Sequence, residues 1–195
     1  MSLSRRTFLC ALSLLPAWAG AQSTVKVEGR VFEGSVQLAG TRLVLNGTGV
    51  RAVAWFTGYA AGLYLTARAG TAAQALSLPG PKRIQLQMMH TVPAVEFTKA
   101  LRKGVARNCT PAQMAQIGQG LERFASQIDA VGKVRKHDVV DLDFDPARGL
   151  LFSINGKLRG EPIPGEALYA GLLRAFVGDD PYDEKMRAGL LGGRA

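Results

Sequence analysis

The stretch GTGVRAVAWFTGYAAGLYL, residues 47–65, is apolar over most of its length and carries one arginine, Arg51, near its start. This pattern predicts one long β-strand that belongs to a hydrophobic core. Burying an unpaired guanidinium costs several kcal/mol or more. Arg51 therefore needs either a carboxylate from its own chain or an anionic ligand.

The two faces of this predicted strand differ in character, because residues of equal parity share a face. One face carries large and polar side chains, namely Arg51, Val53, Trp55, Thr57, Tyr59 and Leu63. The other face carries mostly small residues, namely Val50, Ala52, Ala54, Phe56, Gly58, Ala60 and Gly62. The small face predicts close packing of a helix. Apolar walls with a few converging polar groups are typical of small-molecule pockets.

A guanidinium pairs well with a carboxylate or a phenolate and stays charged at any accessible pH. The large face therefore predicts a site for an anion with a hydrophobic body. Two alternatives remain open from the pattern alone. A bulge at Gly58 would move Tyr59 off the face, and an internal acid would neutralise Arg51, the candidates being Glu28, Glu33 and Asp143.

The N-terminus has the composition of a secretory signal peptide. Arg5 and Arg6 precede a short apolar run, and small residues in an A-x-A arrangement follow. The sequence SRRTFL is typical of the twin-arginine export signal. We expect export to the periplasm and cleavage after Ala21, with Ala19 as the alternative. Removal of 21 of the 195 residues leaves 174, a suitable length for a single domain over residues 22–195.

Cleavage would lower the formal charge from +9 to +7, because two arginines are lost. Basic residues concentrate in three short stretches, PKR (81–83), KALRKGVAR (99–107) and KVRK (133–136). None of them interleaves with aromatic residues as a single-strand-binding surface would. We therefore expect no nucleic-acid partner, and interpret the stretches as two turns and a solvated helix face. Attraction to an anionic membrane surface is left open.

The order of the remaining patterns predicts an α+β fold. Glycine-punctuated strands come first, and a helix pair follows over 93–108 and 110–132. Further strands occupy 138–160, and two short helices close the chain. Segregated runs of strands and helices favour α+β over a doubly wound sheet.

The sequence offers no metal or cofactor motif. His90 and His137 lie far apart and lack partners at ligand spacing. Asp141, Asp143 and Asp145 share one strand face, but the glycine and glutamate usual in a calcium loop are missing. We expect these aspartates to form a solvent-facing row, and we expect no cofactor.

Several motifs together resemble the bacterial chalcone isomerase-like proteins, over nearly the whole mature chain. They are LNGTGVR (45–51), YAAGLYL (59–65), GPKRIQLQM (80–88) and the block from Ser153 to Gly192. The resemblance implies an open-faced β-sandwich, in which a large antiparallel sheet is covered on one side by helices. In the plant enzymes of this family, a phenolate attacks an unsaturated ketone, held by an arginine and several hydroxyl donors.

Only part of that enzyme site matches this sequence. Arg51 corresponds to the arginine, and Tyr59 falls at the position of the strand threonine. The helix tyrosine falls at Phe97, an asparagine at Gly104 and a late threonine at Ala175, so these donors are lost. The loss argues against flavanone chemistry, because each such donor contributes roughly 2–4 kcal/mol.

The resemblance also extends to non-catalytic branches that bind fatty acids, in which the same arginine and a tyrosine hold the carboxylate. Our first hypothesis is therefore a binder of a fatty or similar apolar acid. Its candidate ligand-binding residues are Arg51, Tyr59, Trp55, Thr57 and Phe97. The second hypothesis is an isomerase or intramolecular lyase with Arg51 as the anion holder, and the third is a structural or partner-binding module.

Overall fold

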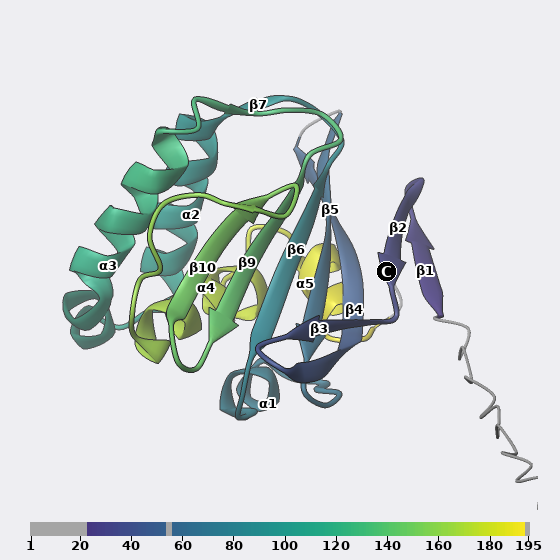
Figure 1. Ribbon diagram of the computed structural model, residues 1–195, viewed down its shortest axis with the longest axis horizontal. Coiled ribbons are helices and arrows are strands. Elements are labelled where there is room, and N and C mark those ends of the chain that lie inside the picture. The colour runs from purple at the N-terminus through teal and green to yellow at the C-terminus, as the bar shows by residue number, and fades with distance from the viewer. Residues whose placement is uncertain (1–22, 54–55, 194–195) are drawn as a thin grey trace, which may run out of the picture.

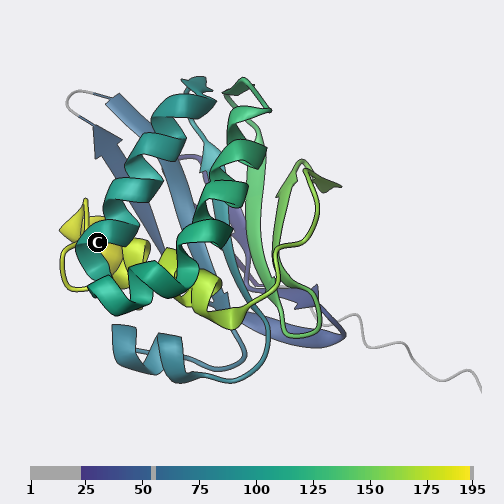
Figure 2. The same ribbon diagram turned by 90° about the vertical axis from the view of Figure 1, so that its left-hand side faces the viewer.

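The computed structural model describes residues 23–53 and 56–193, and it is built on one large antiparallel sheet with helices over one face (Figures 1 and 2). From one edge to the other, the seven strands are β11 (Lys157–Leu158), β10 (Gly149–Ile154), β9 (Val139–Asp145), β6 (Lys82–Met88), β5 (Phe56–Leu65), β4 (Thr41–Val53) and β3 (Ser35–Leu38). Two small antiparallel pairs are β1 (Thr24–Val27) with β2 (Arg30–Glu33), and β7 (Val92–Pro93) with β8 (Lys133–Val134). The predicted α+β class and the open-faced sandwich are confirmed.

The helices are α1 (Ala72–Ser77), α2 (Ala94–Asn108), α3 (Pro111–Asp129), α4 (Glu166–Val177) and α5 (Glu184–Leu190). Figure 2 shows α2 and α3 side by side in front of the sheet. A capping box starts α3, since Thr110 Oγ1 accepts from Gln113 N and the Gln113 side chain accepts from Thr110 N. No helix of the described part of the chain is long and apolar enough to cross a membrane.

The prediction of one long strand over 47–65 is wrong, because β4 and β5 are two strands of an antiparallel pair. Val50 lies opposite Ala60 and Arg51 lies opposite Tyr59, with a register shift between Arg51 and Ala52. A strand of 19 residues would extend about 65 Å at 3.4 Å per residue. A domain of this size is too small for that length, so the chain must fold back.

The assignment of the helices to the small face is also wrong for β5. Its small residues Ala60 and Gly62 face away from the main helices, toward Phe32 of β2. A Cβ on Gly62 would lie 2.7 Å from the Phe32 ring, so the missing side chain makes room for that ring. The helices instead cover the face that carries Tyr59 and Leu63.

The predicted solvent-facing row of aspartates is wrong at two of its three positions. Asp141 and Asp143 are only 7% and 6% exposed. Arg83 of β6 lies opposite Asp143 in register and donates to both of its carboxylate oxygens at 2.6 Å. Gln85 lies opposite Asp141 and donates to it at 2.9 Å. The neighbouring strand thus supplies the partners of these two carboxylates in place of solvent.

The interpretation of PKR (81–83) as a turn is wrong as well, since β6 begins at Lys82. Lys82 is 3% exposed, and its ammonium lies 5.5 Å from the centre of the Phe144 ring. Burial lowers the pKa of Lys82. The stretch 99–107 does form a solvated helix face, in which Lys99 and Arg102 pair with Glu96 and Glu122.

Candidate functional site

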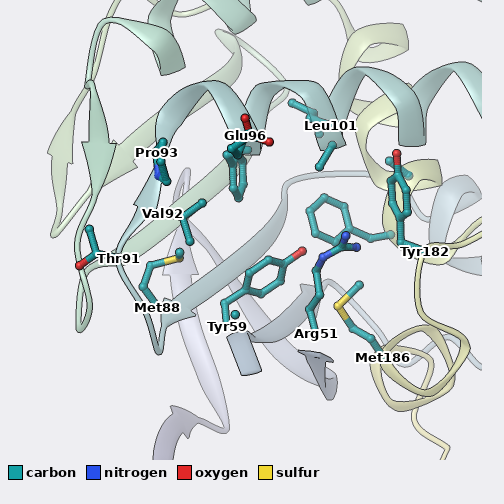
Figure 3. A pocket seen from close by; sticks show the side chains of 15 residues that line it. Arg51, Tyr59, Met88, Thr91, Val92, Pro93, Glu96, Leu101, Tyr182 and Met186 are labelled. Atoms are coloured by element: carbon teal, nitrogen blue, oxygen red, sulfur yellow. The ribbon is translucent and has the colours of Figure 1, made fainter. Parts of the chain in front are cut away.

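A cavity of about 420 Å³ lies between the helix-covered face of the sheet and the helices α2, α4 and α5. Figure 3 shows its main side chains. Its lining is mostly apolar, and consists of Arg51, Gly58, Tyr59, Met88, Thr91, Val92, Pro93, Glu96, Phe97, Ala100, Leu101, Ala175, Phe176, Tyr182 and Met186. The volume falls in the range of small-molecule sites, about 300–1,000 Å³.

The register of β4 and β5 places Arg51 and Tyr59 together on the cavity side. They face the same way because directly opposed residues of an antiparallel pair share a face. The sequence-based reason for grouping them, a common parity on one strand, was incorrect, although the grouping itself holds. In Figure 3 the Tyr59 hydroxyl points toward the Arg51 guanidinium.

Helix α2 closes the cavity from the opposite side. Phe97 and Leu101 lie four residues apart, and therefore project from one face of the helix. The rings of Phe97 and Tyr59 are 6.4 Å apart between centroids and tilted by 52°. This distance suits an aromatic pair, so Tyr59 has an apolar neighbour along its ring and a cation near its hydroxyl.

The charge of Arg51 has no carboxylate partner among the ion pairs of the described residues. Asp143 forms its ion pair with Arg83. Among the described residues, neither Glu28 nor Glu33 forms an ion pair with Arg51. The guanidinium carbon instead lies 4.7 Å from the centre of the Tyr182 ring. Such a cation–π contact contributes about 0.5–2 kcal/mol, less than the cost of an unpaired buried charge.

Tyr59 remains a neutral hydrogen-bond donor over the physiological range. Burial raises the pKa of Tyr59 to about 12, and this effect outweighs the charge of Arg51, which lowers it. The carboxylate of Asp183 acts in the same direction as burial. That carboxylate also caps α5 by accepting from Met186 N at 3.0 Å.

Tyr182 is a site residue that the sequence analysis missed. The guanidinium carbons of Arg51 and Arg107 lie 4.7 and 5.2 Å from its ring centroid, and Arg107 forms an ion pair with Asp180. The absence of a side chain at Gly104 admits the ring, since a Cβ there would lie 3.0 Å from it. Tyr182 stands in the block of residues 153–192 that carries part of the family resemblance. No spacing rule links that block to β4, so the sequence did not place Tyr182 beside Arg51.

The depth and the mouth of the cavity differ in exposure. Met88, Leu101, Phe176 and Met186 are at most 5% exposed and form an apolar interior. Thr91, Pro93 and Glu96 are exposed and mark the mouth. The arrangement combines one cation, Arg51, with the neutral Tyr59 hydroxyl beside it and an apolar space. It can therefore hold a molecule with an anionic group and an apolar remainder.

Three of the predicted site residues, Arg51, Tyr59 and Phe97, line this cavity. Trp55 and the Thr57 side chain lie outside the described residues. Phe97 and Ala175, the positions at which the resemblance implies hydroxyl groups in the plant enzymes, contribute apolar side chains to the lining. No three or more histidine, cysteine, aspartate or glutamate residues of the described chain gather in a way that would hold a metal ion.

Comparison with known proteins places the fold. Residues 24–192 match the family described as chalcone isomerase-like. No curated protein matches the chain. Among solved structures, the crystal structure of an Arabidopsis thaliana fatty-acid binding protein superposes with a TM-score of 0.64 at 18% sequence identity. The alignment covers 87% of this chain and 96% of that one. At this identity, the likeness concerns the fold. Because the family match extends over almost all of the described residues, the chain belongs to the chalcone isomerase-like family.

Proposed function

We propose that this protein binds a fatty acid, or a similar apolar carboxylate or phenolate, without converting it. Arg51 holds the anionic group and the Tyr59 hydroxyl donates to it. The apolar interior of the cavity takes the hydrophobic remainder. The observation that carries this proposal concerns the Arg51 guanidinium. It is half-buried, faces an apolar cavity and forms no ion pair within the described residues.

Two further features support binding over catalysis. The polar groups of the cavity gather at Arg51 and at the mouth, while Phe97 and Ala175 contribute no donor. Stabilising a developing negative charge on a ketone requires fixed donors, each worth roughly 2–4 kcal/mol. An isomerase of the chalcone isomerase type is thus the second candidate. In this second candidate function Arg51 would hold the anionic group of the substrate, and Arg51 is the one residue that supports it.

The fatty-acid binding protein of Arabidopsis thaliana shares the fold of this chain. We extend its ligand class to this protein because the cavity combines a cation with apolar walls, and not because of the fold alone. A structural or partner-binding module, the third hypothesis, would leave the Arg51 charge uncompensated in the free protein.

The test is a calorimetric titration of the delipidated protein with palmitate and with a chalcone, in the wild type and in Arg51→Gln. A charge-assisted hydrogen bond contributes about 1.5–3 kcal/mol. We therefore expect Arg51→Gln to weaken palmitate binding roughly 10- to 150-fold. Arg42→Gln is the matched control, because Arg42 is exposed on the same strand and outside the cavity.

Three outcomes are distinct. Weakening in Arg51→Gln but not in Arg42→Gln supports the proposal. Equal palmitate affinity in all three proteins removes the role of Arg51. Ring closure of the chalcone, observed by absorbance and lost in Arg51→Gln, would favour the isomerase instead.

We also propose that residues 1–21 direct export of the protein to the periplasm through the twin-arginine route. The support is the basic, apolar and small-residue order of that segment. Expression of the full chain followed by cell fractionation and N-terminal sequencing tests this. We expect a mature protein that begins at Gln22, and retention of Arg5→Lys/Arg6→Lys in the cytoplasm. A full-length wild-type protein in the cytoplasm contradicts the proposal.

A further inference from the structure

The mouth of the cavity lies at one end of the molecule. Its exposed residues Thr91, Pro93 and Glu96 belong to β7 and its approach, and to the first turn of α2. Figure 1 shows β7 at the end opposite α1. A partner that binds at this end of the molecule would therefore lie next to the entrance of the cavity.

A short basic segment runs directly beside the mouth. Pro93 lies opposite Lys133 in the β7–β8 pair, and Thr91 Oγ1 accepts from Lys136 N at 3.0 Å. Lys133, Arg135 and Lys136 are exposed. We call these three residues the basic rim. Within the described residues, the ion pairs do not include any member of the basic rim.

The carboxylates near the basic rim form no ion pair with its side chains in the described part of the chain. Asp138 accepts from Arg135 N at 2.7 Å and from Asn155 Nδ2 at 2.8 Å, and Glu96 pairs with Lys99 at 2.9 Å. On α2, Lys99, Arg102 and Arg107 have carboxylate partners, whereas Lys103 is exposed and forms no ion pair within the described residues. The basic rim thus brings three cations, each without an ion pair in the described residues, together within four positions beside the mouth.

An apolar side chain protrudes next to the same rim. Val95, in the first turn of α2, is 47% exposed and lies two residues after Pro93, which is also exposed. Cations around a small apolar protrusion match the two layers of a lipid surface, because anionic headgroups attract the cations and the acyl boundary accepts the apolar side chain.

We propose that this end of the molecule, formed by the basic rim with Pro93 and Val95, docks onto an anionic phospholipid surface. Docking there would place the cavity mouth against the acyl boundary, so that an apolar acid enters without crossing water. This last step rests on the proposed function, whereas the docking itself does not. The apolar protrusion and the adjoining cavity favour lipid over nucleic acid as the partner of the rim, since nucleic acid offers no counterpart to either.

The test is co-sedimentation with two kinds of vesicle, one of phosphatidylcholine alone and one containing a third of phosphatidylglycerol. The probe variant is Lys133→Gln/Arg135→Gln/Lys136→Gln. The matched control, Lys103→Gln/Arg123→Gln/Lys185→Gln, removes the same charge from exposed positions on α2, α3 and α5. Near an anionic surface three such charges together change partitioning by about 100-fold.

We expect wild type and control to bind the anionic vesicles, the probe variant to lose about 100-fold in partitioning, and salt to release the bound protein. Equal binding of probe variant and control overturns the proposal, because total charge rather than the rim would then decide. Binding of the wild type to an oligonucleotide as strongly as to the vesicles, at the same salt, also overturns it.

Palmitate affinity in vesicle-free solution separates the two proposals. The basic rim lies outside the cavity lining, so the probe variant is expected to keep that affinity. Loss of vesicle binding with retained palmitate binding supports both proposals. Intact vesicle binding by a protein that takes up no palmitate would remove the proposed function and leave the docking surface in place.

Discussion

At the scale of single residues, the positive charge of Arg51 is compensated less well than that of Arg83, which has a carboxylate partner. Arg51 is half-buried, it contacts the Tyr182 ring at 4.7 Å, and it lies beside a Tyr59 hydroxyl that stays neutral. The contrast within the same protein is Arg83, which is also partly buried and binds Asp143 through two hydrogen bonds. Arg83 is thus satisfied by the fold, whereas the proposed function supplies Arg51 with the anionic group of a ligand.

Tyr182 is expected to position Arg51 through its ring rather than its hydroxyl, which points away from the guanidinium in Figure 3. Tyr182→Leu should weaken palmitate binding roughly 2- to 30-fold, the equivalent of a cation–π contact. Tyr182→Phe keeps the ring and should bind like the wild type. Calorimetric titration of both variants checks this, and an equal loss in both would mean that the ring contact does not matter.

Tyr59 is expected to make the protein less stable at alkaline pH. Its folded-state pKa of about 12 lies above the ordinary value of 10.0, so the folded state holds the proton more tightly. The resulting stabilisation is complete below pH 10 and is lost as the pH rises from 10 toward 12, reaching a loss of about 1 kcal/mol midway. Urea unfolding across this window should show a shallower decline in Tyr59→Phe than in the wild type. Parallel curves would contradict the assignment.

At the scale of elements, the close approach of α5 to β4 brings Met186 into the cavity lining. A Cβ on Gly49 would lie 2.5 Å from the Met186 carbonyl oxygen, which is backbone and cannot rotate away. The neighbouring Gly189 likewise packs against the backbone of Thr48. Because Gly49 and Gly189 carry no side chain, the backbones of β4 and α5 can approach this closely.

Gly49→Ala should accordingly destabilise the protein by about 1–3 kcal/mol, the usual cost of overpacking. The control is Gly118→Ala in α3, where an added Cβ meets nothing within 4 Å. This control should gain up to about 1 kcal/mol, because alanine favours the helix over glycine. Chemical denaturation measures both changes. A Gly49→Ala protein as stable as the wild type would show that α5 can move away freely.

At the scale of the whole molecule, ligand binding and folding are coupled, because a ligand that binds only the folded state stabilises it. If the proposed palmitate binding holds, palmitate at 100 times its dissociation constant for the wild type is expected to stabilise the folded state by about 2.7 kcal/mol. This corresponds to a rise in Tm of roughly 5–10 °C for a domain of this length. Arg51→Gln at the same palmitate concentration should show a clearly smaller rise by scanning calorimetry. Equal shifts in the two proteins would place the ligand away from Arg51.

The sequence was sufficient for the features that depend on local pattern. The helices α2 and α3 follow from apolar residues at steps of three and four, and their starts follow from Pro93, Thr110 and Pro111. Motif resemblance added the sheet covered by helices, and the family match supports it. The choice of Arg51 as the residue of interest also came from sequence, because a guanidinium in an apolar stretch needs an explanation.

Pairing between strands was decided only by the tertiary structure. Alternation shows which residues share a face of one strand, but not where the chain reverses or which strand lies beside it. This is why 47–65 was predicted as one strand, why Asp143 was assigned to water instead of Arg83, and why Tyr182 was missed. Side chains distant in sequence meet through register and packing, and a one-dimensional pattern carries no record of either.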